Sequence, residues 1–355
     1  MKALGIFALA LFAMSVGAGE STCVSAYYYP WYGADGRHWE LGYEGRDTEG
    51  GPAAGEYDSR SPALLREHFE VSRQFGIGNW ICSWWGPGSW EDVTLREHLL
   101  PPLATAREAG EKPPTFCLFY EAAGLLGLDP ERGIYFDEAK REDFANHFRF
   151  LTENYFSDPS YRRIDGKPVV FLYLSRAFEG DYRRALAEVR AVVRARGLEL
   201  YLVGDEVYWG EPDHERIRLY DAVTPYNMHG PTGYAGLTDG TSFLADCDEV
   251  YARWSRVAQE AGVHFIPGIL PGFDSGGVDA AAHYVIPRRL RPGAGPLSTF
   301  AAMSAMAKKH LDPALREVAI TSFNEWHEGT AIEPAKGAEA SAAKTAEVIR
   351  RVFGE

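Results

Sequence analysis

The sequence has few cysteines and no excess of positive charge, and each shortage excludes a class of protein. Four cysteines in 355 residues are too few for a disulfide-built scaffold. No Cys-X-X-Cys motif and no cluster of histidine and cysteine is present, so we expect no metal site. Lysine and arginine number 36 against 50 aspartates and glutamates, and the net charge of −14 disfavours nucleic acid as a partner.

Long apolar runs are also scarce, because no segment after the N-terminus approaches 18 uninterrupted apolar residues. The chain opens with Lys2, an apolar stretch over residues 3–14 and small residues at 16–18, which is the pattern of a secretory signal peptide. A buried first element and a retained signal anchor are the alternatives. We therefore predict a signal peptide over residues 1–20, a secreted or periplasmic location, and no stable membrane insertion after its removal.

Short apolar runs alternate with longer amphipathic ones, which indicates alternating strands and helices. The expected strands are residues 24–29, 78–84, 114–120, 168–174, 198–204, 221–226, 264–269 and 317–323. The expected helices are residues 62 onwards, 93–109, 137–156, 181–196, 214–219, 241–260, 298–309 and 338–352. Eight such pairs predict an α/β fold, a single (β/α)8 TIM barrel with long loops at the C-terminal face.

A doubly wound open sheet is the alternative to the barrel, but no Gly-X-Gly-X-X-Gly motif follows the first expected strand to support it. No linker rich in proline, serine or glycine divides the chain, so residues 21–355 are expected to form one catalytic domain. Cys82 and Cys117 lie in two neighbouring expected strands, and we expect buried free thiols there.

Aromatic residues are abundant, with 19 Tyr, 19 Phe and 9 Trp. A TIM barrel keeps its functional residues at the C-terminal ends of its strands. Nearly every expected strand end carries tyrosine, tryptophan, histidine or a carboxylate, as in YYYPWYG (27–33) and SWWGPGSW (83–90). Aromatic rings beside polar groups are typical of carbohydrate sites, because the apolar face of a sugar packs on a ring. The alternative is that these rings fill the barrel mouth as core.

The end of the eighth expected strand, SFNEWHEGTAIEP, is the most informative segment. It contains Glu325 and Glu328, and a turn of helix there would place both carboxylates on one side. Glycoside hydrolysis needs two carboxyl groups, one protonated to help the leaving oxygen depart and one ionised as base or nucleophile. Helix surfaces carry such pairs often, so it is the position at a strand end that makes this pair a catalytic candidate.

Four motifs together resemble glycoside hydrolase family 99, the family of endo-α-mannosidases and endo-α-1,2-mannanases. They are YYYPWYG (27–33), His38-Trp39, YDSRSP (57–62) and SFNEWHEGTAIEP (322–334), in this order along the chain. The resemblance implies a (β/α)8 barrel, cleavage inside α-mannan or glucosylated mannose glycans, retention of configuration, and no metal or organic cofactor.

The resemblance also implies roles for the two carboxylates. Glu325 would deprotonate the sugar's own 2-hydroxyl, which attacks C1 and gives a 1,2-anhydro sugar. Glu328 would protonate the leaving oxygen and later activate water. An axial 2-hydroxyl trans to an α leaving group makes this backside attack feasible for mannose.

Further residues are implied by the resemblance to line the mannose-binding subsites. Glu121 follows the third expected strand, although Ala122 and Ala123 stand where the family tends to have proline and an aromatic residue. The other implied substrate-binding residues are Tyr29, His38, Trp39, Trp85, Tyr173, Tyr226, Asn324, Trp326 and His327. A structural or solvated role is the default for Asp205, Glu206 and Asp274, and Glu333 is expected to be a simple loop charge.

Two other functions compete with hydrolysis of an α-mannoside. One is a hydrolase of the same fold that acts on another polysaccharide, and the departure after Glu121 motivates it. The other is a barrel that binds glycan without turnover or acts in surface-polysaccharide synthesis. The presence of both Glu325 and Glu328 argues against that second function.

Overall fold

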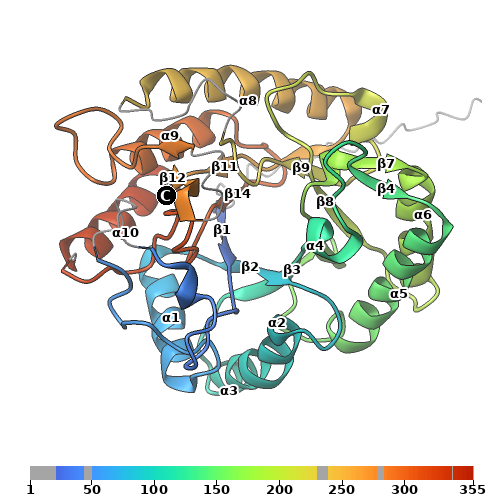
Figure 1. Cartoon of the computed structure of the whole chain (residues 1–355), viewed down its shortest axis with the longest axis horizontal. Coiled ribbons are helices and arrows are strands. Elements are labelled where there is room, and N and C mark those ends of the chain that lie inside the picture. Colours follow the sequence, from blue (N-terminus) through green and yellow to red (C-terminus); the bar gives the residue numbers. More distant parts are fainter. Residues whose placement is uncertain (1–20, 44–49, 230–238, 278–283, 338, 355) are drawn as a thin grey trace, which may run out of the picture.

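A closed barrel of parallel strands forms the centre of the molecule (Figure 1). The computed structural model describes residues 21–43, 50–229, 239–277, 284–337 and 339–354. β1 pairs in parallel with both β2 and β14, so the first and last barrel strands are neighbours. The barrel strands are β1 (Cys23–Tyr28), β2 (Asn79–Trp84), β3 (Thr115–Tyr120), β6 (Lys167–Leu172), β8 (Tyr201–Asp205), β9 (Ala222–Thr224), β10 (His264–Phe265) with β11 (Gly268–Ile269), and β14 (Glu317–Ile320).

The seventh strand is divided into β10 and β11 at Pro267, and these two pieces close the barrel. β10 pairs with β9, and β11 pairs with β14. Hydrogen bonds continue through the break, because Ile266 N–H donates to Val223 O at 2.9 Å and Pro267 O accepts from Ala319 N–H at 3.1 Å. Proline itself has no N–H for the ladder. The described residues therefore contain eight barrel strands, and the predicted barrel is confirmed over an open sheet.

Helices cover the outside of the barrel and return the chain to the start of each next strand (Figure 1). Side-chain caps start several of them. Ser61 Oγ accepts a hydrogen bond from Leu64 N–H at 3.4 Å, and Asp137 Oδ1 accepts one from Lys140 N–H at 2.9 Å. The helices are α1 (Pro62–Phe75), α2 (Trp90–Val93), the π-helix η2 (Thr94–Leu99), α3 (Leu100–Glu108), α5 (Glu138–Asn154), α6 (Tyr182–Arg194), α7 (His214–Ile217), α8 (Thr241–Ala261), α9 (Ser298–Lys309) and α10 (Glu339–Phe353).

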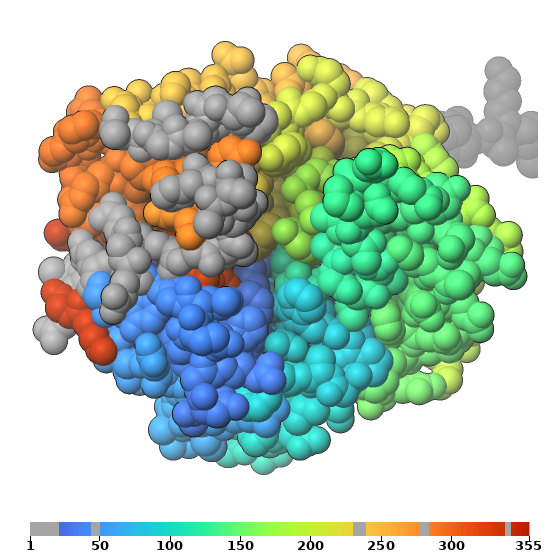
Figure 2. Space-filling view, viewed as in Figure 1, coloured from blue at the N-terminus to red at the C-terminus, as the bar shows by residue number. Residues whose placement is uncertain are grey.

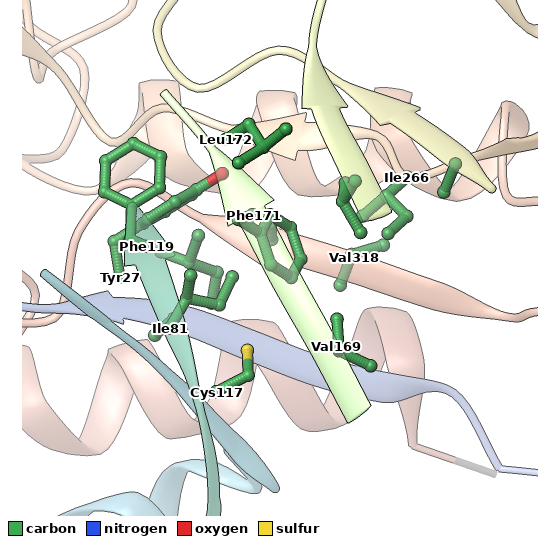
Figure 3. Packing of buried hydrophobic residues seen from close by; sticks show 14 of the residues in the cluster. Tyr27, Ile81, Cys117, Phe119, Val169, Phe171, Leu172, Ile266 and Val318 are labelled. Carbon is green, nitrogen blue, oxygen red and sulfur yellow. The ribbon is translucent and has the colours of Figure 1, made fainter. Parts of the chain in front are cut away.

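Side chains that alternate along the strands fill the barrel in layers. The ring of Tyr27 lies 4.8 Å from that of Phe119 and 6.1 Å from that of Phe171, centroid to centroid, and Figure 3 shows these rings gathered between the strands. Because side chains two residues apart on a strand point the same way, the next inward residues lie nearer the mouth. These next residues are Tyr29, Ser83, Glu121 and Tyr173.

The loops carry small elements that the sequence pattern does not predict. A short helix, α4, follows β3, and two two-stranded ribbons lie in other loops. These elements are α4 (Ala122–Leu126), the parallel pair β4 (Ile134–Phe136) and β7 (Phe178–Gly180), the antiparallel pair β12 (Phe273–Asp274) and β13 (Val285–Ile286), β5 (Arg163–Ile164), and the 3-10 turns η1 (Trp39–Leu41), η3 (Ser175–Ala177) and η4 (Ser275–Gly277).

The predicted helices and strands of the barrel are present, and their first and last residues differ from the structure by a few positions. The helix expected from residue 93 begins at Trp90, because Ser89 Oγ accepts from Asp92 N–H at 3.0 Å and caps an earlier start. Cys82 and Cys117 are buried free thiols, as expected. The expected signal peptide, residues 1–20, lies outside the described residues. Within the described residues, no helix is long and apolar enough to cross a membrane.

Candidate active site

Both candidate catalytic carboxylates lie in the loop after β14. This loop forms a tight turn in which Gly329 N–H donates to Trp326 O at 3.1 Å, rather than the turn of helix that the spacing suggested. The peptide bond between Thr321 and Ser322 is cis. In the space-filling view, the face that carries the loops after the strands is hollowed near its centre, between the blue N-terminal and the green segments (Figure 2).

Glu325 is buried and held by backbone N–H groups. Its Oε1 accepts hydrogen bonds from the N–H of His327 at 2.8 Å and, more weakly, from that of Glu328 at 3.4 Å. Burial first, and then the charge of Glu328, raise the pKa of Glu325 well above its usual value, while the two N–H donors oppose that shift. Such donors favour the ionised form of a carboxyl.

Glu328 is half-buried and has a different environment. No hydrogen-bond partner of its Oε2 is found among the described residues. Burial raises the pKa of Glu328 to about 7. Two carboxyls that interact this closely share their protons as a pair. Burial raises the pKa of Glu325 more than that of Glu328 and so favours a proton on Glu325, whereas the two N–H donors favour its charged form. We assign the proton to Glu328, because the donors contact the Glu325 carboxylate directly and Oε2 of Glu328 has no such partner among the described residues.

Glu121 reaches the same mouth from the end of β3. It is 5% exposed, and its Oε1 accepts a hydrogen bond from Ser83 Oγ at 2.6 Å. Burial, with a contribution from the charge of Glu328, raises the pKa of Glu121 to about 8. Ser83 also accepts from Trp85 Nε1 at 3.0 Å, and Trp85 is 39% exposed at the mouth. The structure thus brings Glu121 and Trp85 together through Ser83, which the sequence analysis missed.

Three tyrosines from different strands meet beside these carboxyl groups. The hydroxyls of Tyr29 and Tyr226 lie 2.5 Å apart, and the rings of Tyr173 and Tyr226 are 5.3 Å apart. Burial raises the pKa of Tyr29 well above its usual value, and the charges of Glu121, Glu325 and Glu328 add to this shift. The three predicted tyrosines therefore lie together at the mouth with the three carboxyls.

Asn324 joins the loop after β14 to the end of β1. Its Oδ1 accepts from Tyr29 N–H at 2.8 Å, and its Nδ2 donates to Tyr29 O at 2.9 Å and to Tyr57 Oη at 3.3 Å. These bonds occupy the amide of a fully buried side chain. Arg288 holds the far side of the loop, donating to Gly329 O and to Ala331 O. Asn324 therefore acts on the site by positioning the loop, and contact with substrate remains a prediction.

Glu333 lies beneath the same loop and is buried, not a solvated loop charge. Its carboxylate accepts hydrogen bonds from Tyr57 Oη at 2.7 Å and from Trp326 Nε1, and it pairs with His68 Nε2 at 3.1 Å. His68 in turn bonds Tyr28 Oη through Nδ1 at 3.0 Å. Glu333 thus anchors Trp326, one of the predicted binding residues, from below.

The remaining aromatic candidates lie in a second cluster around η1. Trp39 is buried and donates from Nε1 to Tyr57 O at 2.9 Å, while His327 Nδ1 lies 3.0 Å from Gly42 O. His38 is half-buried and stacks on Trp31 with ring centroids 4.4 Å apart. Burial lowers the pKa of His38 to about 4, so its ring is neutral at pH 7.

Trp31 was not singled out from the sequence, although the first family motif contains it. Its ring lies 4.4 Å from that of Tyr29, and its Nε1 has no hydrogen-bond partner among the described residues. Trp31 therefore links the rings of Tyr29 and His38 into one row of aromatic side chains. The many aromatic residues at strand ends predict such a row, but the sequence does not show which of the rings faces the mouth of the barrel.

Asp205 and Glu206 have structural partners. Asp205 accepts from the N–H groups of Leu174 and Tyr226, both at 3.0 Å, and pairs with Arg176, so it ties three strand ends together. Glu206 is buried and pairs with Arg216 at 2.7 Å.

Asp274 lies next to the loop after β14, where its N–H donates to Glu328 O at 2.8 Å. No group of three or more histidine, cysteine, aspartate or glutamate side chains suited to a metal ion is found in the described part of the chain.

The chain is similar in sequence to two mammalian proteins. The chain is 23% identical over 349 residues to the glycoprotein endo-alpha-1,2-mannosidase of Mus musculus, covering 87% of this chain and 67% of that protein. It is 24% identical over 353 residues to the glycoprotein endo-alpha-1,2-mannosidase-like protein of Homo sapiens, covering 87% and 68%.

Solved structures show the same fold. A glycoside hydrolase-like protein superposes with a TM-score of 0.71 at 19% identity, covering 100% of this chain and 97% of that one. The GH99 endo-alpha-mannosidase from Bacteroides thetaiotaomicron superposes with a TM-score of 0.60 at 21% identity, covering 93% and 98%. The model of glycosyl hydrolase family 99 matches residues 47–347, most of the chain, and the protein therefore belongs to glycosyl hydrolase family 99.

Proposed function

We propose that this protein is a retaining, endo-acting glycoside hydrolase that cleaves α-mannosidic linkages in mannan or in mannose-containing glycans. The observation that carries the proposal is the unequal environment of Glu325 and Glu328. Backbone N–H groups contact Oε1 of Glu325, whereas Oε2 of Glu328 has no partner among the described residues. This inequality suits one ionised base and one protonated acid, the two groups that glycoside hydrolysis requires.

The first proposed step forms a 1,2-anhydro sugar. Glu325 takes the proton of the sugar's 2-hydroxyl, and that oxygen attacks C1 while the bond from C1 to the glycosidic oxygen breaks. Glu328 gives its proton to the departing oxygen. This arrangement needs an axial 2-hydroxyl trans to an α leaving group, which is why an α-mannoside is the proposed substrate.

The second proposed step opens the anhydro ring. Glu328, now ionised, takes a proton from water, whose oxygen attacks C1. Glu325 returns its proton to the sugar's O2. Two inversions at C1 give net retention, and both carboxyls end in their starting state.

The test is hydrolysis of α-mannan by the protein and by Glu325→Gln and Glu328→Gln variants, with anomeric products followed by NMR. We expect retention in the unchanged protein and a loss of kcat/KM of about a thousandfold in each variant. Glu153→Gln, an exposed change on α5, is the matched control. Full activity in both active-site variants would refute the assignment.

A hydrolase of another polysaccharide is the second candidate, favoured by the segment after Glu121. Ala122 and Ala123 begin α4 there, in place of the residues that the family tends to have. A digest of defined α-mannosides, α-glucans and bacterial surface glycans, scored by product masses, separates the two. Release from an α-glucan or a surface glycan alone would replace the mannoside proposal.

We also propose that the chain is exported with residues 1–20 as a signal peptide. The support is the order of a positive residue, an apolar stretch and small residues in that segment. N-terminal sequencing of the secreted or periplasmic protein tests it, and a mature chain that still begins at Met1 would contradict it.

A further inference from the structure

A chain of hydrogen bonds joins the exposed edge of the mouth to a buried carboxyl. Trp85 Nε1 donates to Ser83 Oγ at 3.0 Å, and Ser83 Oγ donates to Glu121 Oε1 at 2.6 Å. Ser83 is fully buried, whereas Trp85 is 39% exposed. One hydroxyl therefore contacts both a candidate sugar platform and a candidate sugar-binding carboxyl.

An indole N–H only donates, so chemistry fixes the first bond: the Ser83 oxygen accepts from Trp85 Nε1. In the second bond the Ser83 hydroxyl donates to Glu121 Oε1. Oε1 is thus an acceptor, and any proton that Glu121 holds sits on Oε2. Oε2 of Glu121 has no hydrogen-bond partner among the described residues. It is also not one of the buried polar atoms that lack a partner, so it stays accessible from the mouth.

The position of the Trp85 ring depends on two contacts. One is the bond from its Nε1 to Ser83. The other is Gly124 in α4, where an added Cβ would lie 2.2 Å from the six-membered ring.

We propose that Ser83 is a positioning residue for substrate binding: its hydroxyl holds the Trp85 ring and the Glu121 carboxyl in one arrangement, so that a sugar stacked on Trp85 receives a hydrogen bond from Oε2–H of Glu121. The stacked sugar rests on the proposed function. The geometry of the three protein residues does not.

The surroundings of Glu121 favour its neutral, donating form. Burial and the carboxylates Glu328 and Glu91, from the loop after β14 and from α2, raise its pKa to about 8, and the Ser83 bond opposes this shift. The phenols of Tyr29 and Tyr173 face the same carboxyl and are neutral at pH 7. Loss of the Ser83 hydroxyl should therefore raise the pKa of Glu121 further.

The first experiment needs no sugar. Infrared difference spectra against a Glu121→Gln reference follow the protonated carboxyl of Glu121 with pH. We expect a midpoint near pH 8 in the full-length protein and a higher midpoint in Ser83→Ala. Ionisation of Glu121 near its ordinary pKa, or an unchanged midpoint in Ser83→Ala, would overturn the inference.

The second experiment uses α-mannan. We expect Ser83→Ala to raise KM about fivefold with kcat changed less than twofold, as for one lost hydrogen bond. In the unchanged protein KM should rise above about pH 8, and in Ser83→Ala this rise should move to higher pH.

Ser304→Ala, which removes a buried hydroxyl on α9 that bonds Phe300 O, is the matched control and should change neither quantity. An unchanged KM in Ser83→Ala refutes the positioning role. If the unchanged protein does not cleave α-mannan, the proposed function fails, and the infrared titration still decides the effect of Ser83 on Glu121.

Discussion

Replacing Glu333 by glutamine tests how the loop after β14 is held in place. The carboxylate accepts from Tyr57 Oη at 2.7 Å and from Trp326 Nε1, and it pairs with His68 Nε2 at 3.1 Å. Glutamine keeps the shape but removes the charge: the bonds from Tyr57 and Trp326 to Oε1 become neutral ones, and an NH2 group faces His68 Nε2 in place of an accepting oxygen. Each such change costs about 1 kcal/mol, which gives about 3 kcal/mol in total.

The expected readout is a lower melting temperature. An unfolding entropy of about 2.1 cal/mol/K per residue, over 355 residues, converts this loss into a decrease in Tm of about 4 °C. Differential scanning calorimetry measures it. Glu70→Gln is the control, because Glu70 loses the same charge from an exposed pair with Arg73, and such surface pairs contribute little to stability. A Tm of Glu333→Gln within 1 °C of the control would refute this reasoning.

Three further predictions concern the mouth of the barrel. If Glu328 is the acid, kcat/KM on α-mannan declines as pH rises through about 7, because the proton is then lost; a rate that rises through pH 7 would contradict this. Asn324→Ala removes three hydrogen bonds and should lower the free energy of unfolding by about 3 kcal/mol, measured by urea denaturation; a loss below 1 kcal/mol would contradict the role of Asn324 in positioning the loop after β14. Gly124→Ala should displace Trp85 and raise KM about tenfold, whereas Gly295→Ala, with no atom within 4 Å of the added Cβ, should leave KM unchanged. Equal KM values in these two glycine variants would contradict the predicted displacement.

The fold is predictable from the sequence because the barrel strands are continuous apolar runs and the helices have apolar stripes. The break at Pro267 is harder to predict, because residues 264–269 have the pattern of a single strand. The division appears only in the pairing, in which β10 bonds β9 and β11 bonds β14. The small elements α4, β4 and β7 are too short to show a period in the sequence.

The candidate site was predictable only in part. Glu325, Glu328 and Glu121 stand at strand ends, where a barrel collects chemistry, and the structure brings them together. Ser83 lies two residues beyond Ile81 on the same inward face, so the alternation along β2 could have indicated it. The role of Glu333 could not be read from sequence, because its partners His68 and Tyr57 come from a distant part of the chain.

The pairing of β1 with β14 has a consequence for the order of folding. Cys23 pairs with Glu317, so the barrel closes only when nearly the whole chain is available. Contacts of such long sequence separation form late and slowly, and until then the edge of β1 lacks its second partner. Asn324 joins the loop after β14 to Tyr29, at the junction of β1 and β14. We therefore expect the pair of Glu325 and Glu328 to be assembled at the last stage of folding, when β14 joins β1.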